Sequence, residues 1–271
     1  MKILFIHTNY IERGGEDIVY ENELRLMQEA GCETHSLLFN NKRYAAFKFF
    51  FFFFNPISWW QVRRAIRKFK PDIVHIHNWF FAASPSVFIA ARQMKVPVVH
   101  TLHNFRILCP SSFLYVRNEL FKICMTSIFP YQAITTKIYR NSAVDTAWLL
   151  LGTRLHYFLK TWQRIDKFIC LTQSAGQLLG ESLLKIAPGK IAVKPNFFCG
   201  CTDKPADNDA GKSAARELPP MPAVNGVIHA RKDFLYVGRL SAEKGITLLL
   251  DSFRNSPFTL RIIGEIGRAH V

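Results

Sequence analysis

The stretch DFLYVGRLSAEKGITLLLDSF, residues 233–253, consists of a short apolar run, a glycine-containing turn and an amphipathic segment. The apolar run predicts a buried strand, and the periodic segment 243–254 predicts the helix that follows it. Arg239 and Lys244 flank the turn between them, with a glycine beside each. A solvated charged turn would account for the charges but not for the glycines. The arrangement predicts a phosphate site at the carboxyl end of a strand in an α/β fold.

The same alternation of apolar runs and periodic segments fills residues 1–198, which is typical of a parallel sheet covered by helices on both faces. We expect strands at 2–6, 34–39, 72–77, 97–103, 167–172 and 191–196, and helices at 16–30, 58–70, 84–94 and 173–185, with a mostly helical stretch at 131–164. On the first of these helices, the residues expected to face the core are Val19, Leu26, Met27 and Ala30.

Residues 199–232 are rich in Asp, Lys, Pro, Ala and Asn and have no apolar periodicity, which predicts a linker. The α/β pattern restarts after them. The sequence therefore predicts a doubly wound, Rossmann-like domain at 1–198, the linker, and the first strand, helix and strand of a second such domain at 233–264.

Several common sites are excluded. The linker sequence ADNDAGKS ends like a phosphate-binding P-loop, but Ala206 stands in place of its first glycine and no strand precedes it. The sequence ERGGED is not a nicotinamide-binding fingerprint. The cysteines at 109/124 and 199/201 lack the spacing of zinc ligands, so we expect buried thiols and no metal or other cofactor.

The net charge of +15 indicates an anionic partner, such as a phosphate, a nucleic acid or a membrane surface. No nucleic-acid-binding module is recognisable, so we expect no nucleic acid partner. The helix 58–70 carries five basic residues beside the aromatic run 47–60, which favours docking onto an anionic membrane. A second interpretation stays open, in which Trp59 belongs to the core and the arginines are merely solvated. The longest apolar run, 49–54, is too short to span a bilayer.

Polar residues collect where the predicted strands end, and ligands of doubly wound sheets bind at the carboxyl ends of their strands. His103 follows the strand 97–103, and Gly14 and Gly15 lie between the first strand and its helix. Paired glycines at a helix start let backbone N–H groups approach an anion. The other polar residues at these ends are His7, Thr8, Asn9, His75, His77, Asn78, His100 and Asn104.

Taken together, four segments resemble glycosyltransferase family 4 (group 1), whose members are two-domain enzymes of the GT-B fold. FLYVGRLSAEKGI resembles the donor-domain motif of that family, and ERGGED resembles its N-terminal glycine loop. PDIVHIHN and HTLHNFRILCP resemble its acceptor-domain strands. The resemblance runs from Met1 to Gly264.

The resemblance implies a retaining transfer of a sugar from a nucleotide sugar, with no metal, to a glycolipid or oligosaccharide acceptor in bacterial surface polysaccharide synthesis. It implies that Arg239 and Lys244 hold the donor diphosphate beside Gly238, and that His103 lies near the transferred sugar. Gly14, Gly15 and Glu16 would form the acceptor or phosphate loop. The domain at 1–198 would then bind the acceptor, and the protein would work in the cytoplasm on the inner face of the plasma membrane.

The chain also departs from this family, because the acidic pair that grips the donor sugar is missing from it. We therefore expect a chain truncated at its C-terminus. The last residues, IGRAHV, match the in-frame translation of a common sequencing adapter, so we expect 265–271 to be a non-native tail. An alternative from another functional class stays open, namely an inactive fragment that only docks to membranes and binds the acceptor.

Overall fold

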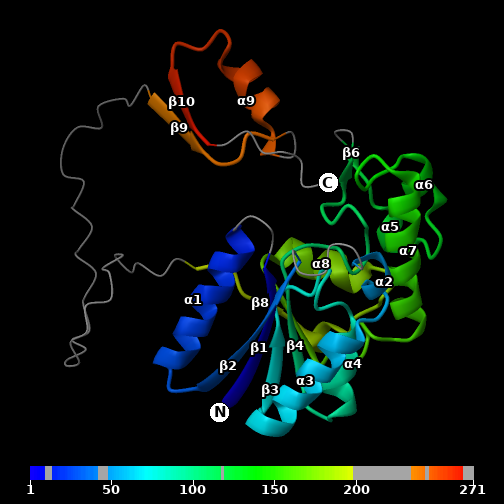
Figure 1. Ribbon diagram of the computed structural model, residues 1–271. Helices are drawn as coiled ribbons and strands as arrows, with labels where there is room; N and C mark the ends of the chain where they lie inside the picture. The colour runs from blue at the N-terminus through cyan, green and yellow to red at the C-terminus, as the bar shows by residue number, and fades with distance from the viewer. Residues whose placement is uncertain (10–13, 42–47, 117–118, 198–232, 242–243, 265–271) are drawn as a thin grey trace, which may run out of the picture. The chain divides into compact units, whose positions relative to one another are not determined.

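The structure is a computed structural model, and it describes residues 1–9, 14–41, 48–116, 119–197, 233–241 and 244–264 (Figure 1). These residues form two compact units, the first at 1–197 and the second at 233–264, and each is described by itself. The expected linker and the expected non-native tail lie outside the described residues.

The first unit is built on a six-stranded sheet in which all neighbouring strands are parallel and follow the order β2-β1-β3-β4-β7-β8. Leu4, Phe5 and Ile6 of the central β1 are completely buried, as expected for a strand covered on both faces. The predicted Rossmann-like fold is confirmed. The strands are β1 (Lys2–Asn9), β2 (Glu33–Asn40), β3 (Ile73–Ile76), β4 (Val98–Leu102), β7 (Lys167–Cys170) and β8 (Ile191–Val193).

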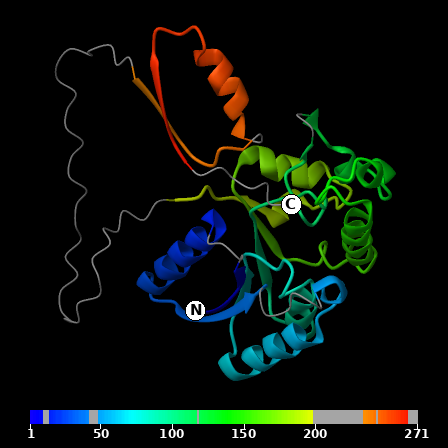
Figure 2. The same ribbon diagram turned by 45° about the horizontal axis from the view of Figure 1, so that its top comes forward.

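Helices cover both faces of this sheet (Figures 1 and 2). Ile3 and Phe5 of β1 pack with Tyr20 of α1 (Gly15–Glu29), whereas Leu4 and Ile6 belong to a larger core on the other face. That larger core includes side chains from α3 (Pro56–Phe69), α4 (Ser86–Gln93), α7 (Ala143–Phe158) and α8 (Gln173–Glu181). Alternate residues of β1 thus pack against helices on opposite faces of the sheet.

Between β4 and β7 the chain forms small elements, and the predicted helical stretch at 131–164 is broken. The elements before the break are β5 (Tyr115–Val116), β6 (Glu119–Leu120), α5 (Ile123–Thr126) and α6 (Tyr131–Thr135). Arg140 and Asn141 have positive φ angles of 55° and 52°, which a helix does not tolerate. Ser142 then caps α7 by accepting a hydrogen bond from the backbone N–H of Asp145.

The predicted buried face of α1 is only partly confirmed, since Met27 packs against the core of Ile3, Phe5 and Tyr20. The buried side chains of α1 are Asp17, Tyr20 and Glu23, whereas Leu26 and Ala30 are exposed. The reason is that both carboxylates find partners beneath the helix, and paired charges can be buried where unpaired ones cannot.

The second unit consists of two parallel strands, β9 (Asp233–Val237) and β10 (Thr259–Ile263), with α9 (Ile246–Phe253) between them in sequence. The helix begins three residues later than the sequence predicts, because Gly245 at its start is left-handed with a φ of 69°. At the strand ends, a Cβ on Gly264 would overlap the carbonyl oxygen of Gly238, so the two backbones approach as only glycine permits.

Two short elements complete the first unit, the helix α2 (Lys48–Phe51) and a 3₁₀ turn at Pro188–Lys190. Among the helices of the described residues, none combines the length and the apolar character that crossing a membrane requires.

Candidate functional site

The residues predicted to act on ligands fall into both units. Those of the first unit come together at the carboxyl ends of β1, β3 and β4, and those of the second unit lie between β9 and α9. The first group is Gly14, Gly15, Glu16 and His103, and the second is Gly238, Arg239 and Lys244.

The glycine loop of the first unit is anchored by the side chain of Asp17. One carboxylate oxygen accepts a hydrogen bond from the backbone N–H of Gly14 at 2.7 Å, and the other lies 2.7 Å from Nε2 of His7. Both side chains are buried. Around Gly15 there is open space, since a Cβ placed there would meet no atom within 4 Å. Asp17 therefore fixes the backbone of Gly14 at the start of α1, and the space around Gly15 stays open to a ligand.

Glu16 joins this loop to the end of β4. Its Oε1 accepts a hydrogen bond of 3.0 Å from the side-chain amide of Asn104, which directly follows His103. Predicted site residues that are 88 positions apart in the chain are thereby brought together.

A cluster of histidines lies beneath this loop. His77 Nδ1 is 3.2 Å from His103 Nε2, and His75 Nε2 is 2.8 Å from the hydroxyl of Thr101. The Nε2 atom of His77 is buried and has no hydrogen-bond partner among the described residues. His100 Nδ1 bonds instead to the backbone carbonyl of Ile76, so His100 is a satisfied core residue.

Burial keeps these imidazoles neutral. Loss of hydration is the main cause and neighbouring positive groups the second, and together they lower the pKa of His103 to about 4 and that of His75 to about 3. The pKa of His77 falls well below its ordinary value for the same reason. A neutral His103 can exchange hydrogen bonds with a sugar hydroxyl but carries no charge for a phosphate.

Glu23 and Lys194 place an ion pair against this cluster. The Nζ of Lys194 lies 3.1 Å from Oε2 of Glu23, and the same carboxylate is 3.8 Å from His75 and 3.7 Å from His77. Burial raises the pKa of Glu23, and the ammonium of Lys194 opposes that rise. Among the described residues, Glu23, His75 and His77 are the group with the geometry to ligate a metal, but Lys194 already balances the carboxylate.

In the second unit, Gly238 ends β9 by donating its backbone N–H to the carbonyl of Ile263 at 3.0 Å. The chain then turns, and Tyr236 fixes that turn by donating its hydroxyl to the carbonyl of Arg239 at 2.9 Å. Lys244 follows, with its backbone N–H bonded to the carbonyl of Ser241. Arg239 and Lys244 thus lie between the end of a parallel strand and the start of a helix, where phosphates bind in such folds.

Sequence reasoning missed Asp17, Tyr20, Glu23 and Lys194. A signal was present for three of them, because positions 17, 20 and 23 recur every three residues and share one side of a helix. The spacing was overlooked because charged residues are normally expected on the exposed face of a helix. No pattern in the sequence pairs Lys194 with Glu23, which lies 171 residues away.

Comparison with known proteins gives one family. A family model described as Glycosyltransferase Family 4 matches residues 19–198. No curated protein matches the chain.

Solved structures that match this chain include MurG from Acinetobacter baumannii, which is 12% identical with a TM-score of 0.45, over 99% of this chain and 59% of the MurG chain. HepE from Anabaena in complex with UDP is 15% identical with a TM-score of 0.44, over 98% of this chain and 61% of its own. A UDP-GlcNAc 2-epimerase from Methanocaldococcus jannaschii is 12% identical with a TM-score of 0.42, and the match covers 99% of this chain and 74% of the epimerase chain. The chain thus spans less than two thirds of MurG and of HepE.

Proposed function

Because this chain belongs to glycosyltransferase family 4, we propose that the protein moves a sugar from a nucleotide-sugar donor to a lipid-linked or polysaccharide acceptor, with retention of the anomeric configuration. We place this reaction in bacterial surface polysaccharide synthesis, in the cytoplasm on the inner face of the plasma membrane. The observation that carries the proposal is the turn after β9, where two cations follow the end of a parallel strand.

In this proposal, Arg239 and Lys244 hold the donor diphosphate and stabilise the charge that develops on it as the glycosidic bond breaks. The close approach of Gly238 and Gly264 leaves the strand ends without side chains there, so the backbone can come near a phosphate. Two side-chain cations supply the positive charge, and the proposed reaction needs no metal.

The first unit is proposed to bind the acceptor. Gly14, Gly15 and Glu16, predicted as a loop, form the start of α1, where Asp17 fixes the backbone of Gly14 and the space around Gly15 is open. His103 is neutral and hydrogen-bonded to His77, so it orients a sugar hydroxyl rather than a phosphate.

We also propose that the first unit docks onto an anionic membrane. Trp60 on α3 is 51% exposed, and the guanidinium of Arg64 lies 5.2 Å from the centre of its ring. Trp59 is different, because its indole N–H is bonded to Gln93 of α4 and its ring packs against the core. Exposed aromatic and basic side chains on one helix suit the interface of an anionic bilayer.

The test is a calorimetric titration of the purified chain with UDP-, GDP- and ADP-sugars, followed by an assay for sugar transfer to membrane extracts. We expect binding of one nucleotide class and release of the nucleoside diphosphate. A folded protein that binds none of them would contradict the donor assignment.

One observation favours the second candidate function, an inactive acceptor-binding and membrane-docking fragment. In the second unit, apolar side chains are exposed, with Val237 at 69% and Leu248 at 73%. Two strands and one helix offer little core, and such assemblies are only marginally stable. Vesicle binding without any nucleotide-sugar binding would support this candidate.

A further inference from the structure

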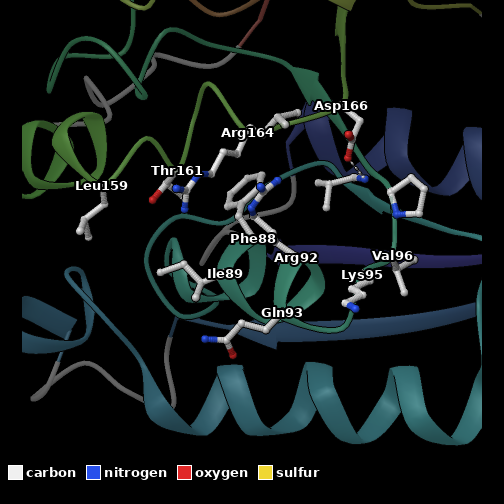
Figure 3. A pocket seen from close by; sticks show the side chains of 13 residues that line it. Phe88, Ile89, Arg92, Gln93, Lys95, Val96, Leu159, Thr161, Arg164 and Asp166 are labelled. Carbon is white, nitrogen blue, oxygen red and sulfur yellow. Dashed lines mark hydrogen bonds between the residues drawn. The ribbon is translucent and has the colours of Figure 1, made fainter.

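A cavity of about 740 Å³ lies in the first unit between α4 and the segment that leads into β7 (Figure 3). One wall comes from α4 and the turn into β4, and the other comes from residues 159–166. Because β4 and β7 begin beside it, the cavity lies at the amino ends of the strands. The histidine cluster lies at the carboxyl ends of the strands, so the cavity is at the opposite end of the sheet and forms a separate site.

The interior of this cavity is apolar. Phe88 and Ile165 belong to the hydrophobic core beneath it, and Ile89 and Val96 are partly exposed in its walls. Leu159 at its rim is 49% exposed. A volume in this range holds a ligand of the size of a small lipid segment, and aliphatic walls favour a hydrocarbon chain over a sugar or a nucleobase.

The rim of the cavity is positively charged. Arg92, Lys95 and Arg164 are exposed lining residues, and Figure 3 shows Arg92 on the α4 wall and Arg164 on the facing segment. The one carboxylate of the lining, Asp166, accepts a hydrogen bond of 2.8 Å from the backbone N–H of Val98. Three cations against one carboxylate make the rim a site for an anion.

Two exposed surfaces flank the cavity. On one side, Gln93 in its wall accepts hydrogen bonds from Trp59 and Arg63 of the basic helix α3, at 3.0 Å and 2.8 Å. On the other side, exposed apolar residues of α7 lead up to Leu159, with Leu155 at 40% and Phe158 at 58%. The cavity therefore opens between a basic, aromatic surface and an apolar one.

We infer that this cavity binds one anionic phospholipid of the membrane, with the phosphate between Arg92 and Arg164 and the upper part of an acyl chain against the partly exposed side chains of Ile89, Val96 and Leu159. The inference rests on the membrane docking in the proposed function. It adds the class of lipid that the protein binds and the place where the lipid binds. The combination of a cationic rim with an aliphatic interior matches a lipid phosphate better than inorganic phosphate, which would leave the interior unfilled.

The test is flotation of the full chain with vesicles of phosphatidylcholine, with and without phosphatidylglycerol. We expect binding only to the vesicles that contain phosphatidylglycerol. The double variant Arg92→Ala/Arg164→Ala should bind them about 30-fold more weakly, since each basic residue near an anionic surface contributes roughly a fivefold factor. The control Arg25→Ala/Lys122→Ala removes the same charge outside the cavity lining and should bind with at most a fewfold loss.

A second arm separates a lipid from a simple anion. Dihexanoyl-phosphatidylglycerol below its micelle concentration should raise the melting temperature of the wild type but not of the double variant, and inorganic phosphate should have no such effect. Equal stabilisation by inorganic phosphate, equal vesicle binding by the double variant, or no binding of the wild type to anionic vesicles would each overturn the inference. The variant Arg239→Ala should keep vesicle binding, so failure of the donor assignment is distinguished from failure of this one.

Discussion

Lys194 and Glu23 form a salt bridge of 3.1 Å between the end of the first unit and the first helix. The carboxylate is almost completely buried, whereas about a third of the lysine side chain is exposed. A single ammonium at the surface thus balances a carboxylate that faces two neutral histidines, and it fastens the segment after β8 to α1.

Replacing this lysine should therefore destabilise the first unit. We expect Lys194→Met to lower the free energy of unfolding by about 1–3 kcal/mol, because a buried carboxylate without a partner is costly. Lys194→Arg keeps the charge and should lose much less. Urea unfolding measures the free energy of unfolding of both variants. Since the cost falls on the ionised form of Glu23, whose pKa is already raised by burial, the deficit of Lys194→Met should shrink as the pH falls. An unchanged deficit between pH 7 and pH 5 would contradict this account.

The buried histidines should make the fold sensitive to acid. Burial lowers the pKa of His75 to about 3 and that of His100 to about 4, while in the unfolded chain such groups titrate near 6.5. The unfolded state therefore binds more protons, and stability falls as the pH drops from about 6.5 towards 4. Each such histidine contributes up to about 1.4 kcal/mol per pH unit. Unfolding curves at pH 7 and pH 5 should show the loss, and His75→Gln should make it less steep.

Arg239 and Lys244 should be needed for turnover rather than for folding. We expect Arg239→Ala and Lys244→Ala each to reduce kcat/KM for the nucleotide sugar by about 10²–10³-fold, the usual effect of removing a group that stabilises developing charge. Arg254→Ala is the matched control, because this residue lies in the same unit, is exposed and pairs with Asp251. Steady-state assays compare them. Equal activity of all three variants would exclude these cations from the reaction.

Gly152 should tolerate no side chain. It lies on α7, and a Cβ there would overlap the ring of Phe52, which is completely buried. We expect Gly152→Ala to lower the melting temperature, with a loss of about 1–3 kcal/mol from overpacking. Gly180→Ala on α8 is the control, because its Cβ would make only ordinary contacts, and it should stabilise the helix by up to about 1 kcal/mol. Thermal unfolding followed by circular dichroism separates the two.

Much of the fold follows from local pattern. The strands of the first unit lie where apolar runs such as KILFIH and DIVHIH predict them, because a strand buried on both faces needs a nearly continuous apolar sequence. Helix ends were harder to predict. The start of α9 depends on the positive φ of Gly245, and the break before α7 depends on two residues with positive φ. A glycine such as Gly245 permits a positive φ without fixing where a helix begins, and nothing local in the sequence predicts a positive φ at Arg140.

The candidate site divides in the same way. His103 and the glycine loop could be predicted, because polar residues after consecutive parallel strands meet at one edge of a sheet. The spacing of Asp17 and Glu23 places them on one side of a helix, but their burial could not be predicted, since on an isolated helix they would face water. They become buried only because the fold supplies His7, Lys194 and the backbone of Gly14 as partners.

The sequence by itself determined the strand–helix alternation, the family and the two cations after β9, since these depend on residues close together in the chain. The tertiary structure alone decided which face of α1 is buried, which charges are paired, and that Arg92 and Arg164 share one cavity. The physical reason is that burial of charge and the shape of a cavity depend on partners far apart in sequence, and only folding sets the distances between them.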